Sequence, residues 1–221
     1  TLDALAAAGV EVAYHQVDVR DAEGVRGVVA SIYERHGRLD GLVHGAGVLH
    51  DRYIVDKPPE AFERVFATKV DGARTLLGAI RRAVADDGRD RPAFVVFFGS
   101  TAGVCGNRGQ ADYAAANDAL DTMAAAHRDI ADAVLALDWG PWSSEYGMVS
   151  EHLAAMFQEA GMGLIEIDDG TAVLLDEIAA AVAGGNGAAG GVHVVGGAPH
   201  QITVARCTPA LITAAFGQEP Q

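Results

Sequence analysis

Four polar side chains of this sequence have the types and the spacing needed to act on a carbonyl group. Tyr113 and Asn117 are four residues apart in a predicted helix, so they share one face of it. Ser100 closes the apolar segment before this helix, and Lys69 lies on an earlier helix. Reduction of a ketone needs an acid that protonates the oxygen and a second donor that holds it. Tyr113 fits the first role and Ser100 the second.

Lys69 and Asn117 fit supporting roles in the same chemistry. A phenol has an ordinary pKa of about 10, and a nearby ammonium group lowers such a pKa by stabilising the anion. Lys69 is the candidate for that ammonium, and Asn117 could anchor a water molecule that relays a proton to bulk solvent. Each residue alone has a plainer interpretation, because buried tyrosines pack, helix lysines are solvated and serines cap helices. Only the combination predicts a site.

Predicted strands and helices alternate along the chain. The predicted strands are 10–17, 39–44, 94–98, 133–137 and 192–195, and the predicted helices are 22–36, 59–84, 109–127 and 169–182. Beyond Gly197 the pattern allows one more extended segment. This alternation predicts an α/β fold with a doubly wound parallel sheet.

Several segments follow predicted strands directly, and on parallel sheets that edge binds ligands. They are Asp18, Gly45 to Gly47, Ser100 and Trp139 to Trp142. A dinucleotide site normally opens with a strand and a glycine-rich turn, and nothing upstream of Asp18 supplies that turn. We therefore expect the chain to begin inside a fold and to lack its first strand-turn-helix, so the phosphate-binding residues cannot be assigned.

Composition excludes several classes of protein. Apolar residues make up 50% of the chain, and no run of eighteen suits a membrane span, so we expect a soluble protein with no membrane contact. The net charge of −14 disfavours nucleic acid as a partner. No secretory signal precedes the first strand, and Cys105 and Cys207 lie far apart without metal-ligand spacing. These features indicate a cytoplasmic protein with reduced cysteines and no metal site.

The chain is long enough for one domain. We expect that domain to cover residues 1–205, with a helical insert at about 143–163 that is rich in Ser, Gly and Met, and a tail or linker at 206–221.

The residues around the tyrosine resemble a known family. Phe97 to Ser100 and Gly109 to Asn117 are similar to the Rossmann-like short-chain dehydrogenase/reductase superfamily, and more narrowly to ketoreductase domains of polyketide and polyunsaturated fatty acid synthases. Ordinary members place the lysine four residues after the tyrosine and the asparagine on the earlier helix. Lys69 and Asn117 are exchanged here, as in synthase ketoreductases. The segment 106–110 most resembles iterative systems of the enediyne or polyunsaturated type.

The resemblance implies NADPH as cofactor. The residues that it assigns to cofactor binding, besides Lys69 and Tyr113, are Asp18 and Val19 near the adenine, Gly45, Ala46 and Gly47 along the cofactor, and Gly140, Pro141 and Trp142 at the nicotinamide carboxamide. The insert at 143–163 corresponds to a lid helix over the substrate. Trp139 and Trp142 have core packing as an equal alternative to stacking near the nicotinamide.

Stereocontrol is also assigned by resemblance. In the family, an Asp after the Gly-Ala-Gly turn accompanies a D-hydroxy product, and a Trp before the tyrosine accompanies an L-hydroxy product. Asp51 keeps the first feature and Cys105 stands in place of the Trp, which favours the D-hydroxy product, although His50 departs from the motif. Gln110, at the start of the tyrosine helix, is assigned with them.

The implied reaction is reduction of a β-ketoacyl thioester on an acyl carrier protein to the β-hydroxyacyl thioester, with that carrier and other synthase domains as partners. Two alternatives stay open: a non-catalytic ketoreductase-like structural subdomain, and a free-standing dehydrogenase acting on another alcohol or ketone. Two further motifs have plainer interpretations. His44 is read as a packed residue in preference to a general base, and Asp168-Asp169-Gly170 as a helix cap in preference to a calcium loop.

We expect the 221-residue chain alone to bind NADPH weakly, because no glycine-rich turn is recognised for the pyrophosphate. Fluorescence titration with NADPH measures this directly. Tight binding would show that other residues of the chain hold the phosphates.

Overall fold

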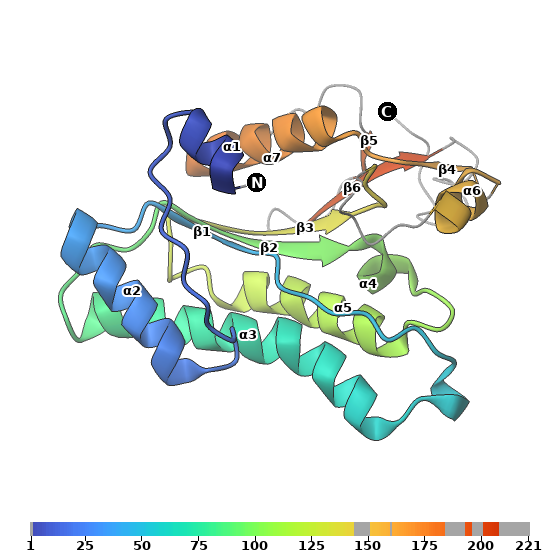
Figure 1. Cartoon of the computed structure of the whole chain (residues 1–221), viewed down its shortest axis with the longest axis horizontal. Helices are drawn as coiled ribbons and strands as arrows, with labels where there is room; N and C mark the ends of the chain where they lie inside the picture. The colour runs from blue at the N-terminus through green and yellow to red at the C-terminus, as the bar shows by residue number, and fades with distance from the viewer. Residues whose placement is uncertain (1, 144–150, 160, 184–192, 196–200, 208–221) are drawn as a thin grey trace.

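The computed structural model describes residues 2–143, 151–159, 161–183, 193–195 and 201–207 (Figure 1). The helices are α1 (Leu2–Ala7), α2 (Ala22–His36), α3 (Pro59–Ala85), α4 (Thr101–Cys105), α5 (Ala111–Ala126), α6 (Glu151–Glu159) and α7 (Ile167–Val182), with a 3-10 turn η1 (Ile54–Asp56) before α3. The strands are β1 (Gly41–His44), β2 (Phe94–Ser100), β3 (Ala133–Trp139), β4 (Met162–Gly163), β5 (His193–Val195) and β6 (Gln201–Cys207). No helix within these ranges is long and apolar enough to cross a membrane.

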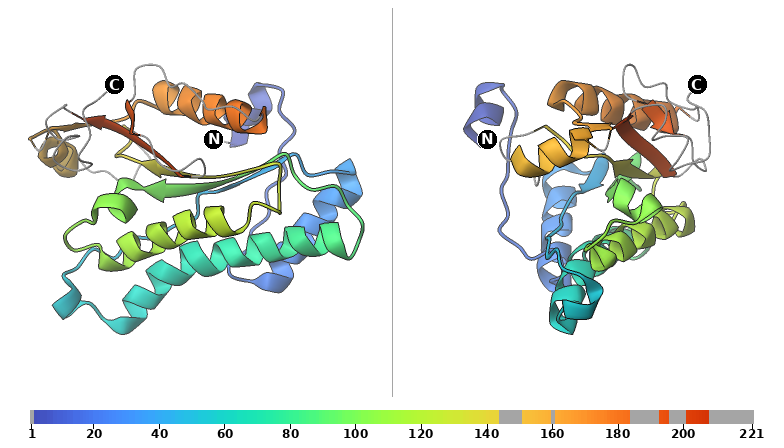
Figure 2. Two further views of the ribbon diagram at one scale, coloured as in Figure 1. Left: turned by 180° about the vertical axis from the view of Figure 1, so that it is seen from behind. Right: turned by 90° about the vertical axis from the view of Figure 1, so that its right-hand side faces the viewer.

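The strands form one sheet in the order β1-β2-β3-β6-β4, and β5 also pairs with β6. β1, β2, β3 and β6 run parallel, whereas β4 and β5 run antiparallel to β6. Helices α2, α3 and α5 lie on one face of the sheet and α7 on the other (Figures 1 and 2). The predicted parallel sheet with flanking helices is therefore confirmed, with two antiparallel strands added beside β6.

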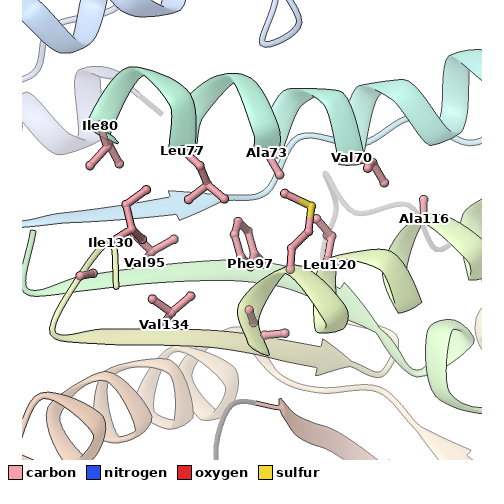
Figure 3. Packing of buried hydrophobic residues seen from close by; sticks show 14 residues of the cluster. Val70, Ala73, Leu77, Ile80, Val95, Phe97, Ala116, Leu120, Ile130 and Val134 are labelled. Carbon is pink, nitrogen blue, oxygen red and sulfur yellow. The ribbon is translucent and has the colours of Figure 1, made fainter. Parts of the chain in front are cut away.

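The larger core lies between the sheet and helices α3 and α5. Phe97, Leu120 and Ala116 are completely buried in it, and Figure 3 shows the apolar face of α3 turned towards the strands. Small alanine side chains on α5 let this helix approach the sheet closely. This packing fixes the two helices that carry Lys69 and Tyr113 against the strand that ends at the predicted serine.

Helix α2 has the boundaries that the sequence predicts because both of its ends are capped. The Asp21 carboxylate accepts hydrogen bonds from the backbone N–H groups of Glu23 and Gly24, each at 3.1 Å. Gly37 ends the helix with φ of +77°, a left-handed conformation that glycine adopts without strain.

The predicted strand at 10–17 is wrong. Residues 10–18 form no regular secondary structure, and Val10, Val12 and Tyr14 are exposed. A strand needs a neighbour for its N–H and C=O groups. No described strand pairs with this segment, and β1 has a described neighbour on one side only. The alternating pattern is present, but the sheet that would bury it is not among the described residues.

Other predicted boundaries differ in smaller ways. The helix predicted at 109–127 is α5, which begins at Ala111, after the positive φ of Gly109. The short helix α4, which directly follows β2 and ends before Gly106, was not expected from the sequence. The extended segment predicted beyond Gly197 is β6, which continues past the predicted domain end at 205. Within the predicted insert, α6 and β4 are described, whereas residues 144–150 and 160 lie outside the described residues, as does the tail at 208–221.

We expect Leu120→Ala to lower the free energy of unfolding by about 2–5 kcal/mol, because it opens a cavity in the closed core under α5. Leu175→Ala is the matched control on α7, where the leucine is 60% exposed and the same truncation should change stability little. Urea unfolding of both variants measures the difference. Equal effects would contradict the packing described for α5.

Candidate active site

Lys69 reaches the site from the middle of α3, a helix of 27 residues. The side chain is buried, and its Nζ donates a hydrogen bond to the backbone oxygen of Phe98 at 2.8 Å. Nε2 of His44 lies 2.8 Å from the backbone oxygen of Lys69, so this nitrogen must carry the ring hydrogen. His44 therefore binds the backbone of α3, which fits its interpretation as a packed residue.

Ser100 lies at the carboxyl end of β2. It occupies the N-cap of α4, where its Oγ accepts a hydrogen bond from the backbone N–H of Ala102 at 3.2 Å. Its side chain also lowers the pKa of Tyr113, as expected of a hydroxyl close to the phenol. Ser100 can therefore cap α4 and still act on Tyr113.

Tyr113 and Asn117 lie one turn apart near the start of α5. The Lys69 Nζ lies 5.4 Å from the centre of the Tyr113 ring. Asn117 Nδ2 donates to the Tyr113 backbone oxygen at 2.7 Å, whereas its buried Oδ1 has no hydrogen-bond partner among the described residues. The structure thus brings together the side chains that the sequence singled out, while their roles stay predictions.

The electrostatics of the pair differ from the expectation. Burial raises the pKa of Tyr113, and hydrogen bonding by Ser100 and Asn117 offsets only part of this effect. The net result is a Tyr113 pKa above its ordinary value. Burial also lowers the pKa of Lys69 to about 8, which the charge of Asp138 opposes. The ammonium is therefore close to its own titration at neutral pH.

Asp18 and Val19 lie in the segment that leads into α2. The Asp18 carboxylate is exposed and pairs with Arg20 at 2.7 Å, which holds its pKa at about 2. Val19 packs on α3, where a Cβ added to Gly72 would lie 2.8 Å from a Val19 methyl group. The segment thus runs beside α3, and its contact with an adenine stays a prediction.

Gly45, Ala46 and Gly47 follow β1 at the same edge of the sheet. Gly45 is exposed, and among the described residues a Cβ added to it would approach only the Phe98 ring, at 3.9 Å. A ligand could therefore come close to this backbone, as the predicted role requires.

Gly140, Pro141 and Trp142 follow β3. The Gly140 N–H donates to Val204 of β6 at 2.7 Å, and Pro141 accepts from the N–H of Ile165 at 2.8 Å. The Trp142 ring meets the Trp139 ring edge-on with 4.8 Å between centroids. Both tryptophan side chains pack in a second apolar core, which lies on the α7 side of the sheet. The packing interpretation of these two residues fits the structure, and cofactor contact at 140–142 stays a prediction.

The predicted stereocontrol residues lie on two segments that touch each other. Gln110 Nε2 donates to the Asp51 carboxylate at 2.9 Å, and the Arg52 N–H donates to the Gly109 oxygen at 2.9 Å. Cys105 is exposed at the end of α4. Asp51 is therefore held in place at the start of the tyrosine helix.

A buried ion pair that the sequence analysis missed ties the same two segments together. The Lys57 ammonium lies 2.5 Å from the Asp112 carboxylate, and each side chain is only 1% exposed. Lys57 also donates to the His50 oxygen at 2.7 Å, and Asp112 accepts from the Tyr113 N–H at 2.9 Å. The composition contains a signal for Lys57, because Lys57 and Lys69 are the only two lysines in a chain that otherwise uses arginine for its positive charges.

Asp168 and Asp169 lie inside the first turn of α7, whose N-cap is Glu166, so the predicted cap is displaced. Negative charge in a first turn suits the helix dipole. No group of three potential metal ligands occurs among the described residues.

We expect Lys57→Met and Asp112→Asn each to destabilise the chain by about 3–5 kcal/mol, because each leaves one buried charge unpaired. The double variant should lose less than the sum of the two. Arg74→Met, which breaks an exposed pair with Asp71, is the control and should change stability by less than about 1 kcal/mol. Urea unfolding of all four variants tests this, and strict additivity would contradict the direct pairing of Lys57 with Asp112.

Comparison with known proteins identifies the family. Residues 1–144 match the KR domain family. The chain is 37% identical over 168 residues to a polyunsaturated fatty acid synthase polypeptide of Thraustochytrium sp., covering 76% of this chain and 6% of that protein. It is 40% identical over 174 residues to the polyketide synthase GfsB of Streptomyces halstedii, covering 77% of this chain and 3% of that protein. The chain thus spans only a small part of these relatives.

Solved structures agree. A ketoreductase domain from the bacillaene assembly line superposes with a TM-score of 0.76 at 30% identity, covering 96% of this chain and 47% of that one. A ketoreductase from the first module of phoslactomycin biosynthesis in Streptomyces sp. gives a TM-score of 0.74 at 25% identity, covering 100% of this chain and 46% of that one. The chain therefore belongs to the ketoreductase domains of polyketide synthases, within the short-chain dehydrogenase/reductase superfamily.

Proposed function

We propose that this chain reduces the β-ketoacyl thioester of an acyl carrier protein to the β-hydroxyacyl thioester, with NADPH as the donor. The observation that carries the proposal is the meeting of Tyr113, Ser100 and Lys69 from three different elements, with Asn117 one turn beyond the tyrosine. All four side chains are present, which argues against the non-catalytic alternative. The similarity to synthases argues against a free-standing dehydrogenase.

Tyr113 and Ser100 act on the carbonyl oxygen of the substrate. The Tyr113 hydroxyl donates its proton to this oxygen as the carbonyl carbon gains a hydride, which gives the alcohol. The Ser100 hydroxyl donates a hydrogen bond that holds the oxygen while its negative charge develops. Because burial favours the neutral phenol, Tyr113 carries the proton that this step consumes.

Lys69 and Asn117 deal with the charge left on Tyr113. The Lys69 ammonium beside the ring stabilises the phenolate once the proton has left. The unpartnered Oδ1 of Asn117 suits it to hold a water molecule that returns a proton from solvent.

The residues present fit a nicotinamide cofactor. Lys69 uses one of its three hydrogens on the Phe98 oxygen, which leaves two for the hydroxyl groups of a sugar. Lys69, Tyr113 and the backbone of 45–47 and 140–142 would hold the cofactor, which supplies the hydride when bound. Asp51, fixed by Gln110, supports the D-hydroxy product, and the similarity to a polyunsaturated fatty acid synthase suits an iterative system.

We expect Tyr113→Phe to lower NADPH-dependent reduction of a β-ketoacyl thioester by about 10²–10⁴-fold, because the proton donor is removed. The assay uses the synthase polypeptide that carries this chain and follows NADPH absorbance. Tyr14→Phe is the matched control, since Tyr14 is 72% exposed and its variant should keep full activity. Retention of near-parent activity by Tyr113→Phe would overturn the assignment.

A further inference from the structure

Two buried carboxyl groups lie behind the site, and the proposed reaction uses neither. Asp121 comes from α5 and Asp138 from β3, and they are 7% and 0% exposed. The amide of Gln201, from β6, donates one hydrogen to each, at 2.8 Å to Asp121 Oδ2 and at 3.0 Å to Asp138 Oδ2. The Oδ1 atom of each carboxyl has no hydrogen-bond partner among the described residues.

Two ionised carboxylates are not stable in this arrangement. Burial of an unpaired charge is costly, and like charges that share a site repel each other. Gln201 is neutral and Asp118, on the same helix as Asp121, adds further repulsion. The charge of Asp138 also acts on the Lys69 ammonium and the Cys105 thiol, and the backbone N–H of Ser100 lowers the pKa of Asp138. Among the described residues, Lys69 is the one positive group that acts on the pair, so at most one negative charge is compensated there.

We propose that Asp121 and Asp138 share one proton between their free oxygens, and that the single negative charge left on the pair makes Asp138 a positioning residue for Lys69 and Ser100. A shared proton gives both Oδ1 atoms a partner, and Gln201 already serves both Oδ2 atoms. Each of the four carboxyl oxygens then has at least one hydrogen bond. Repulsion between the two groups and burial both raise their pKa values, which agrees with a retained proton.

The position of Asp138 explains how it acts on the site. Asp138 lies opposite Gly99 in the pairing of β2 with β3, and a Cβ added to Gly99 would clash with Asp138 Oδ1. The carboxyl group therefore lies against the backbone immediately before Ser100. The charge of Asp138 also raises the pKa of Lys69 against the effect of burial. Asp138 thus favours the ammonium that the proposed reaction needs.

The shared proton predicts a pH-dependent stability. Unfolded aspartates ionise near their ordinary pKa of about 3.9, whereas the folded pair keeps its proton to higher pH. The folded state then binds more protons, so stability falls as pH rises, and one proton makes the unfolding equilibrium constant rise about tenfold per pH unit. Stability stops falling above the raised pKa of the pair.

Urea unfolding of the 221-residue chain at pH 5 and pH 7 measures this linkage. In Asp121→Asn the amide supplies the hydrogen permanently, so we expect its unfolding constant to rise about a hundredfold less over this range than that of the parent. Asp87→Asn, an exposed change just after α3, should keep the parent dependence. Equal pH dependence in the parent and Asp121→Asn overturns the shared proton. If Asp121→Asn does not fold, infrared spectroscopy of the parent at pH 7 decides, because a protonated carboxyl band is expected and its absence contradicts the proposal.

The positioning role rests on the proposed function, but its test does not need activity. With only two lysines in the chain, ¹³C-lysine labelling gives two NMR signals, and Lys57 serves as the internal control. Asp138→Asn moves the negative charge to Asp121, so the pKa of Lys69 should fall. Asp121→Asn fixes the charge on Asp138, so the same pKa should rise. Shifts of the same sign, or none, overturn the role of Asp138.

The reduction assay adds a second readout. The alkaline limb of the rate against pH should move with the Lys69 pKa, to lower pH in Asp138→Asn and to higher pH in Asp121→Asn. Failure of the proposed function would appear as full activity in Tyr113→Phe with the proton linkage intact. If instead the shared proton and the role of Asp138 are wrong, Tyr113→Phe loses activity as expected. The Lys69 pKa then does not shift in opposite directions in Asp138→Asn and Asp121→Asn.

Discussion

The buried ammonium of Lys69 is the charge around which the described part of the protein is organised. An unpaired charge in an apolar interior is unstable, so the neighbouring elements must supply groups that stabilise it. β2 supplies a backbone oxygen that accepts its hydrogen bond, and α5 supplies the face of a tyrosine ring. β3 supplies a carboxyl group whose charge favours the ammonium. β1 contributes indirectly, since its last residue, His44, holds the backbone of Lys69. The parallel pairing of β1, β2 and β3 matters because it brings these groups to the same edge of the sheet, at the carboxyl ends of the strands.

Much of this arrangement could be predicted from local sequence. α2 and α3 have the predicted boundaries because caps, a first-turn proline and apolar spacing act within one helix. Tyr113, Asn117 and Ser100 were identifiable because they lie on one helix and the strand end before it. The site needed only the further assumption that parallel strands end at one edge.

What could not be predicted depends on partners far away in the sequence. Residues 10–17 alternate like a strand, yet a strand forms only where a neighbouring strand accepts its hydrogen bonds. Lys57 and Asp112 are each ordinary polar residues until the fold buries them together. The same is true of Asp121 on α5 and Asp138 on β3, because it is an amide from a third element, β6, that joins them.

The two lysines have a consequence for the outside of the molecule. Arginine stays protonated in any environment, whereas the charge of lysine responds to burial, and this chain keeps lysine for the interior and arginine for the remaining basic positions. Lysine amines are also the groups that acylating agents modify, and thioesters are such agents. Neither lysine of this chain is exposed, so a thioester of the proposed substrate class would meet no lysine amine on its surface that it could acylate.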